Sequence, residues 1–299
     1  MAEVTLAQVL EAREIRAARQ QELLAAYGKP LICFTMNIAG PVKVDEYTEY
    51  AFRVGCVRLL EGLRTMGYPV ILQEDISSGA GFCLMIVADA DAQAVKRLCV
   101  QFEDRDPLGR LFDMDVIAPE GFKLERAEER CCLVCGAPGR GCASRRLHPL
   151  SELQAATRRV IRKHKRLADS ERMASLAVQS LLDEVCATPK PGLVDRHDNG
   201  SHRDMDIFTF NASAAALWPY FQKCFLAGID TREQAPAVAF DHLNALGVAA
   251  EGTMRRTTAN VNTHKGAIYT LGILCGAAGR VWSMDKPQLI PWLADCADL

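Results

Sequence analysis

The chain has 299 residues, of which 49% are hydrophobic and 24% are charged, and its formal net charge is -2 at pH 7. This composition indicates an ordinary globular protein, and the length favours two domains over one. The small net charge argues against a nucleic-acid partner. No apolar run is long enough to cross a bilayer, which argues against a membrane partner.

The N-terminus lacks the basic and apolar regions of a signal peptide, so we expect a cytoplasmic location. The chain contains twelve cysteines. Most of those in the first 100 residues stand singly in apolar stretches, where cysteine is typical of a small buried hydrophobic residue. The cysteines therefore do not predict a disulfide scaffold.

Two helices are predicted near the N-terminus. Thr5 and Gln8 have the spacing of a capping box, which predicts a helix that ends at Gly28. One side of this helix is cationic because Arg13 and Arg16 lie three residues apart, although a solvated face is the simpler interpretation. Asp45 is expected to cap the second helix.

Strands and helices alternate in this part of the chain. The predicted strands are 31–36, 70–72, 82–87 and 109–117, and a third helix is predicted over 90–102. A Gly/Pro turn follows the first strand and has Lys43 at its exit. This alternation predicts an α/β or α+β N-terminal domain.

The last of these strands alternates apolar and acidic residues. Successive side chains point to opposite faces of a strand, so Leu111, Asp113 and Asp115 are expected on one face. Two carboxylates roughly 7 Å apart along a strand repel unless a cation lies between them, and such ligands suit Mg²⁺. Gly109 permits close approach of the backbone, and Arg110 supplies a phosphate-binding guanidinium. The alternative is an edge strand with a solvated acidic face.

The loop after this strand is rich in potential metal ligands and in positive charge. Cys132, Cys135, Cys142 and His148 are a plausible tetrahedral zinc set, but their gaps match no standard zinc finger. The alternative is a loop with reduced cysteines. The same loop contains arginines that would receive phosphates or be solvated, namely Arg140, Arg145 and Arg146.

The second half of the chain is predicted to be helical throughout. A basic helix from Ser151 leads to a domain boundary near residue 168, and Asp169 or Ser170 is expected to cap the next helix, which Pro189 ends. Further helices are predicted over 212–227, over 234–254 and from Ala267.

Two polar loops interrupt these helices. The first contains Lys190 together with several acids. The second has His264, Lys265 and Gly266 at the start of a helix, where free N–H groups bind anions. Capping of the helices is the alternative role for both loops.

Four segments carry a resemblance to a known family: EAREIR at 11–16, NIAGPVK at 37–43, LGRLFDMDV at 108–116, and CLVC to RRLH at 132–148. They occur in order, and the region 1–168 resembles CitX, the apo-citrate lyase phosphoribosyl-dephospho-CoA transferases. The resemblance implies a nucleotidyltransferase-like domain. A serine of the apo acyl-carrier subunit would attack triphosphoribosyl-dephospho-CoA, and pyrophosphate would leave.

The resemblance also implies roles for individual residues. Asp113 and Asp115 would hold Mg²⁺, and either could take the serine proton. The groups implied in substrate binding are Arg110, Gly109, Lys43, Arg13 or Arg16, Arg145 and Arg146.

A second set of segments resembles CitG, the triphosphoribosyl-dephospho-CoA synthases: TPKPGLVD at 188–195, HRDM at 202–205, FNAS at 210–213 and VNTHKG at 261–266. This family is all-helical and uses ATP and dephospho-CoA with release of adenine. Region 169–299 lacks counterparts of the family's later acidic and glycine-rich motifs, so a truncated domain is expected. The implied phosphate ligands are Lys190, His264 and Lys265, and the implied metal ligands are Asp195, Asp204 and Asp206.

Two other functions remain open at the level of sequence. One is a non-catalytic, zinc-stabilised module that binds the carrier subunit. The other is a nucleotidyltransferase with a different acceptor, because paired aspartates after a glycine recur in that class.

Overall fold

The computed structural model describes residues 3–284 and divides the chain into two compact units, one ending at His164 and the other beginning at Lys165. In that part of the chain, no helix has the length and apolar character needed to span a membrane. The elements of the N-terminal unit are α1 (Leu6–Tyr27), β1 (Leu31–Met36), α2 (Glu46–Thr65), β2 (Val70–Asp75), β3 (Cys83–Ala88), α3 (Ala92–Arg105), η1 (Gly109–Leu111), β4 (Phe112–Ile117) and α4 (Gly139–Ser144). Helix α5 (Leu150–Cys186) contains the boundary, and α6 (Ile207–Ala216), α7 (Trp218–Asp230), α8 (Pro236–Thr257) and α9 (Lys265–Arg280) follow.

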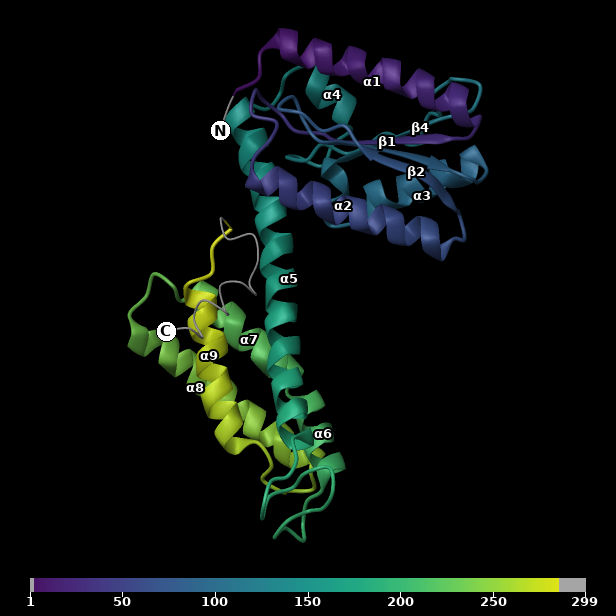
Figure 1. Ribbon diagram of the computed structural model, residues 1–299. Helices are drawn as coiled ribbons and strands as arrows, with labels where there is room; N and C mark the ends of the chain where they lie inside the picture. Colours follow the sequence, from purple (N-terminus) through teal and green to yellow (C-terminus); the bar gives the residue numbers. More distant parts are fainter. Residues whose placement is uncertain (1–2, 285–299) are drawn as a thin grey trace. The chain divides into compact units, whose positions relative to one another are not determined.

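The N-terminal unit is built on one antiparallel sheet with strand order β2-β3-β1-β4. Helix α1 covers one face of this sheet, and α2 and α3 cover the other (Figure 1). The prediction of an α/β or α+β N-terminal domain followed by a helical region is confirmed at this coarse level, since strands and helices alternate in the N-terminal unit and the described part of the C-terminal unit is helical.

Local sequence determines where the first two helices begin. Thr5 and Gln8 form a reciprocal capping box at the start of α1, as predicted. Asp45 and Thr48 form the same motif at α2, where Asp45 Oδ1 accepts a 2.8 Å bond from the backbone N–H of Thr48. Gly28 ends α1 in the left-handed conformation with φ of 58°, which glycine adopts without strain.

The two faces of the sheet have different cores. Leu31 and Cys33 of β1 pack beneath Leu23 of α1. On the opposite face, Phe34 packs against Phe112 with ring centroids 5.3 Å apart. A Cβ atom added at Gly55 of α2 would lie 2.4 Å from the Phe34 ring, so glycine is needed where this helix crosses the sheet.

The predicted strand 109–117 begins later than expected. Residues Gly109–Leu111 form a 3-10 turn, and the strand starts at Phe112. Leu111 is fully buried in this turn, so the prediction that it shares the acidic face is wrong. Gly109 is also buried, and a Cβ there would lie 2.2 Å from the carbonyl oxygen of Phe102. The close approach that Gly109 permits is therefore to α3, not to a phosphate.

The predicted helix start at Asp169 or Ser170 is also wrong, because α5 runs through both residues. Asp169 Oδ2 accepts bonds of 2.7 Å from Lys165 Nζ and from Trp282 Nε1. Ser170 Oγ donates to the carbonyl oxygen of Leu167 at 2.7 Å. These polar side chains thus have partners that let the helix continue.

The C-terminal unit is held together by close helix packing. A Cβ added at Gly228 of α7 would lie 2.0 Å from the carbonyl oxygen of Gly276 of α9, so both helices approach backbone to backbone. The predicted helix 212–227 is instead two helices, α6 and α7, which break at Leu217 just before Pro219. Helix α6 begins after Asp206, earlier than predicted, because Asp206 caps it.

Candidate active site

The acidic side chains of β4 lie on one face of the sheet. Asp113 pairs in register with Thr35 of β1, and Asp115 pairs with Cys33. Their side chains are 48% and 30% exposed, whereas Phe112, Met114 and the other apolar residues of the strand are buried. The edge strand thus presents two accessible carboxylates on one side and a packed core on the other.

Basic groups neighbour both carboxylates. Lys123 Nζ lies 2.7 Å from Asp115 Oδ2. Burial disfavours the lysine charge, but the bond to Asp115 and the negative charge of both aspartates outweigh it and raise the pKa of Lys123. Arg130 Nη1 lies 3.9 Å from Asp113 Oδ1, and Thr35 Oγ1 donates to Asp113 Oδ2 at 3.5 Å. Repulsion between the two aspartates is thereby reduced.

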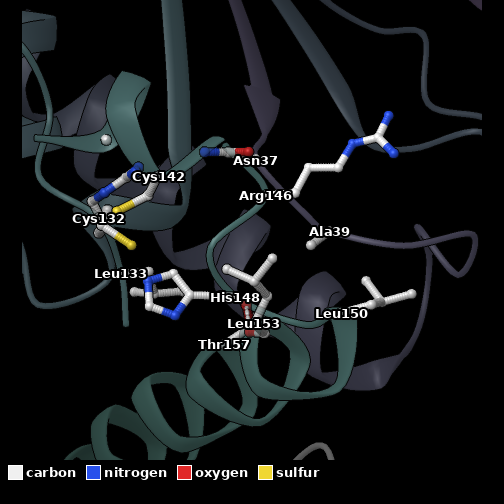
Figure 2. Close-up of a pocket in the computed structure, with 12 residues that line it drawn as sticks. Asn37, Ala39, Cys132, Leu133, Cys142, Arg146, His148, Leu150, Leu153 and Thr157 are labelled. Carbon is white, nitrogen blue, oxygen red and sulfur yellow. Dashed lines mark hydrogen bonds between the residues drawn. The ribbon is translucent and has the colours of Figure 1, made fainter. Parts of the chain in front are cut away.

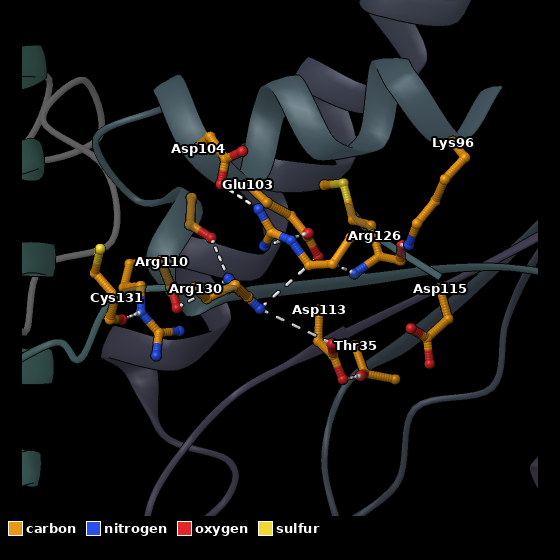
Figure 3. A network of polar contacts seen from close by, with 12 residues as sticks. Thr35, Lys96, Glu103, Asp104, Arg110, Asp113, Asp115, Arg126, Arg130 and Cys131 are labelled. Carbon is orange, nitrogen blue, oxygen red and sulfur yellow. Dashed lines mark hydrogen bonds and ion pairs between the residues drawn. The ribbon is translucent and has the colours of Figure 1, made fainter. Parts of the chain in front are cut away.

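A buried ion-pair network holds Arg130 beside β4 (Figure 3). Glu103 of α3 is only 6% exposed and accepts the backbone N–H of Met114 at 2.8 Å. Its carboxylate lies 3.4 Å from Arg126 and 3.8 Å from Arg130. Arg130 also donates to the carbonyl oxygen of Gly109 at 2.8 Å. Helix α3, turn η1 and the loop after β4 are tied together at this point.

Helix α1 adds positive charge on the acidic side of the sheet. The pKa of Cys33 is lowered mainly by its hydrogen bond with Cys83, and the positive charge of Arg16 lowers it further. The negative charge of Asp115 acts on the same thiol in the opposite direction. The charges of Arg16 and Asp115 therefore both act at Cys33.

Lys43 and Arg13 form a second basic pair. Lys43 Nζ donates to the carbonyl oxygen of Ile38 at 2.5 Å, which fixes the side chain within the 37–43 turn. Partial burial lowers the pKa of Lys43, and the nearby charge of Arg13 lowers it further. The two cations that the sequence predicts from α1 and from the turn are thus close enough for the charge of Arg13 to act on Lys43.

A cavity of about 420 Å³ lies between the 37–39 turn, the cysteine-containing loop and the first turns of α5 (Figure 2). Its polar walls include Asn37, Arg110, Arg146 and Thr157, and Leu150 supplies part of the apolar wall. Two of the predicted phosphate-binding arginines therefore face one hollow. Neither Asp113 nor Asp115 lines it.

Arg110 and the remaining loop arginines differ in how they are held. Arg110 Nε donates to the carbonyl oxygen of Cys131, and burial lowers the pKa of its guanidinium. Arg146 has a positive φ of 49°. Arg145 is exposed, and its Nε donates to the carbonyl oxygen of Gly141 at 3.3 Å, outside the cavity wall.

The four predicted zinc ligands come together in the same loop. One ligand atom from each of Cys132, Cys135, Cys142 and His148 lies within 4.8 Å of the others. The backbone N–H of Ala137 is the main cause that lowers the pKa of Cys135 to about 6, and His148 and Cys142 contribute. Within residues 3–284, this is the only group of three or more His, Cys, Asp or Glu side chains arranged closely enough for one metal ion.

The three acids predicted as metal ligands in the C-terminal unit are not assembled in this way. Asp195 is buried and accepts hydrogen bonds from the backbone N–H groups of His197 and Lys190 and from Thr188 Oγ1, which lower its pKa and stabilise the loop. Asp206 caps α6, and Asp204 is exposed 4.0 Å from His202. Loop and cap hydrogen bonding therefore occupies two of the three carboxylates.

The predicted phosphate ligands of this unit have protein partners. Lys190 Nζ pairs with Glu184 at 2.9 Å, and Lys265 lies 3.7 Å from Glu251. His264 is only 5% exposed, and its Nδ1 lies 2.8 Å from Ser213 Oγ. The capping alternative fits the start of α9 in part, since Asn262 Oδ1 accepts the backbone N–H of Lys265 at 3.3 Å.

Sequence reasoning missed several residues that shape the site. Glu103, Lys123 and Arg130 belong to no recognisable motif in the sequence, and only the fold brings them to β4. The sequence did contain a signal for the contact between Glu152 and His148. The two residues are four positions apart at the start of a predicted helix, a spacing at which side chains meet.

Comparisons with known proteins match each unit to a family of dephospho-CoA group transferases. Residues 4–164 match the family described as apo-citrate lyase phosphoribosyl-dephospho-CoA transferase (CitX). Residues 170–296 match the family described as ATP:dephospho-CoA triphosphoribosyl transferase (CitG). The chain belongs to the CitX family and continues into a CitG-like region, which favours an enzyme over a non-catalytic binding module.

Similar proteins combine the same two regions. The chain is 33% identical over 282 residues to Protein CitXG of Haemophilus influenzae and 31% identical over 293 residues to Protein CitXG of Leuconostoc mesenteroides. These matches cover 93% and 92% of this chain but only 60% and 61% of the relatives. This chain is also 44% identical over 118 residues to the 2-(5''-triphosphoribosyl)-3'-dephosphocoenzyme-A synthase of Klebsiella pneumoniae. That match covers 40% of this chain and 39% of the Klebsiella protein.

Proposed function

We propose that the N-terminal unit transfers the phosphoribosyl-dephospho-CoA group from triphosphoribosyl-dephospho-CoA to a serine of the apo acyl-carrier subunit of citrate lyase. The observation that carries this proposal is the CitX match over residues 4–164. Paired aspartates that follow a Gly-Arg turn on β4 support a nucleotidyltransferase-like reaction. Pyrophosphate would be the second product.

Asp113 and Asp115 would hold Mg²⁺ in this reaction. The residues fit that ion because two partly exposed carboxylates share one face, and Mg²⁺ binds proteins through one or two carboxylates together with substrate phosphates. When bound, Mg²⁺ would neutralise negative charge on the triphosphate. Lys123 and Arg130 supply part of this neutralisation from the protein itself.

The bond changes are those of a phosphoryl substitution. The serine Oγ forms a bond to the α-phosphorus, and the bond from that phosphorus to the bridging oxygen of the β-phosphate breaks. The serine proton passes to Asp113 or Asp115, and pyrophosphate leaves with the electron pair of the broken bond. Arg110, Lys43 and Arg16 are the cations that we assign to the pyrophosphate.

Carrier-dependent release of pyrophosphate tests this function. The full chain is incubated with donor and Mg²⁺, with the apo carrier or with a carrier whose acceptor serine is replaced by alanine. We expect pyrophosphate only with the unmodified serine. Release that is equal with both carriers would mean that the chain hydrolyses the donor or uses another acceptor.

We also propose that the C-terminal unit acts in formation of the donor from ATP and dephospho-CoA. The 44% identity to part of the Klebsiella synthase supports this second activity. ATP and dephospho-CoA as substrates fit an enzyme of the cytoplasm. Incubation of the full chain with ATP and dephospho-CoA should release free adenine. Absence of adenine would contradict the proposal for this unit and would leave the transfer reaction of the N-terminal unit unaffected.

A further inference from the structure

The loop between β4 and α5 has the backbone of a metal-binding turn. In the segment Cys132-Leu133-Val134-Cys135-Gly136, the backbone N–H of Gly136 donates to the carbonyl oxygen of Cys132 at 3.0 Å. Gly136 has φ of 73°, a conformation that most residues adopt only with strain. The turn therefore directs both cysteine side chains to the same side.

Two later residues complete the cluster. Cys142 lies on α4, and its sulfur is 3.4 Å from the sulfur of Cys135. His148 Nε2 is 3.3 Å from the Cys135 sulfur. A tetrahedral zinc ion with bonds of about 2.3 Å to sulfur separates its ligand sulfurs by about 3.8 Å, so the observed spacing is near that of a single ion. It is far longer than a disulfide bond, and all these cysteines are free.

The histidine is oriented as a metal ligand requires. His148 Nδ1 lies 3.1 Å from Glu152 Oε2, one turn further along the chain. A carboxylate that binds one imidazole nitrogen fixes the ring so that the other nitrogen faces the metal. Glu152 thus directs Nε2 of His148 toward the three thiols.

We propose that Cys132, Cys135, Cys142 and His148 bind one structural zinc ion. All four positions of a tetrahedral ion are filled by protein, which is typical of a structural site and leaves none for a substrate. No step of the proposed transfer reaction uses this ion, so the two proposals stand or fall separately.

The ion stabilises a wall of the cavity. Cys132, Cys142 and His148 line the cavity together with Arg110 and Arg146 (Figure 2). The carbonyl oxygen of Cys131, which accepts the Arg110 hydrogen bond, is one residue from the first ligand. Zinc therefore fixes the loop that positions the cavity arginines.

Metal analysis of the full chain, purified under reducing conditions, tests the site. We expect about one zinc per chain in the unaltered protein and at least a tenfold loss in Cys142→Ser. Cys131→Ser is the matched control, because this neighbouring thiol is exposed and outside the cluster, and it should retain full zinc. His148→Cys should also retain zinc, since a fourth thiolate can replace the imidazole.

Cobalt binding provides a measurement that does not depend on folding of the variants. The unaltered chain, freed of metal by a chelator and kept reduced, should bind Co²⁺ with the intense visible absorption of a tetrahedral thiolate site. Zinc should abolish this absorption at one equivalent. Absence of zinc together with failure to bind Co²⁺, or full zinc retention in Cys142→Ser, would overturn the proposal.

Discussion

Lys123 Nζ lies 2.7 Å from Asp115 Oδ2, on the sheet face that also carries Asp113. The lysine follows β4 by a short turn and is half-exposed, so it can leave the carboxylate at little cost. Asp113 has a comparable neighbour in Arg130 at 3.9 Å. Two basic side chains of the protein thus offset part of the negative charge of the acidic pair.

The first prediction concerns Asp113 itself. Asp113→Asn should lower the rate of transfer about 100-fold or more, because the change removes a charged ligand or base and keeps the shape of the side chain. Stability should change little, since the side chain is 48% exposed. Urea unfolding monitors the fold, and Glu61→Gln, an exposed change on α2, is the activity control. Transfer at the unaltered rate would remove Asp113 from the mechanism.

The second prediction concerns competition between Lys123 and Mg²⁺. Lys123→Met should increase the affinity for Mg²⁺ about fivefold, because an exposed ion pair of this kind contributes about 1 kcal/mol at most. The Mg²⁺ dependence of the transfer rate measures this shift, and titration calorimetry measures it without substrate. An unchanged Mg²⁺ requirement would show that the ion does not displace the lysine from Asp115.

The third prediction compares two adjacent acids on α3. Arg126 lies closer to Asp104, at 2.7 Å, than to Glu103, at 3.4 Å. Glu103 is nevertheless the more important partner, because its side chain is 4% exposed and that of Asp104 is 45% exposed. Glu103→Leu should cost about 3 kcal/mol, since it leaves buried arginine charge uncompensated. Asp104→Asn should cost less than about 1 kcal/mol.

Urea unfolding followed by far-UV circular dichroism measures both variants of this pair. Equal effects would mean that distance outweighs burial in this network. Glu103→Leu should also reduce transfer, because Arg130 and the backbone of Met114 both contact Glu103 beside the acidic strand.

The fourth prediction is a pH dependence of the C-terminal unit. Burial lowers the pKa of His264 to about 4 in the folded chain. The unfolded chain, with an ordinary pKa of about 6.5, binds more protons between these values, so stability is full above pH 6.5 and falls as the pH drops toward 4. The loss between pH 7.5 and pH 5.0 should be about 2 kcal/mol.

Tryptophan fluorescence is a suitable probe, because all three tryptophans of the chain come after residue 217. His264→Asn keeps a polar group near Ser213 and should remove most of the pH dependence. His242→Gln, at an exposed position of α8, should retain it. The same slope in His264→Asn and the unaltered chain would assign the effect to other groups.

The sequence alone was sufficient to predict those features of the fold that depend on residues close together in the chain. The Thr5 and Asp45 caps, strand 31–36 and the shared face of Asp113 and Asp115 follow from spacing alone, and the structure confirms them. The cysteine and histidine cluster was also visible as a set, and the structure brings its four residues together.

Sequence failed where the partner is distant. Asp169 was expected to cap a helix. Its Oδ2 instead accepts a hydrogen bond from Nε1 of Trp282, which lies more than 100 residues later in the chain. Arg130 could not be assigned to Asp113, since the contact depends on the buried Glu103 that holds the arginine in place.

The central claim is that the acidic face of β4 serves transfer of a phosphoribosyl-dephospho-CoA group to a carrier serine. The intact mass of the apo carrier, after incubation with the full chain, donor and Mg²⁺, tests it most directly. We expect the carrier mass to increase by one phosphoribosyl-dephospho-CoA group with the unaltered chain and to stay unchanged with folded Asp113→Asn. No increase with the unaltered, folded chain, or an equal increase with both chains, would contradict the account.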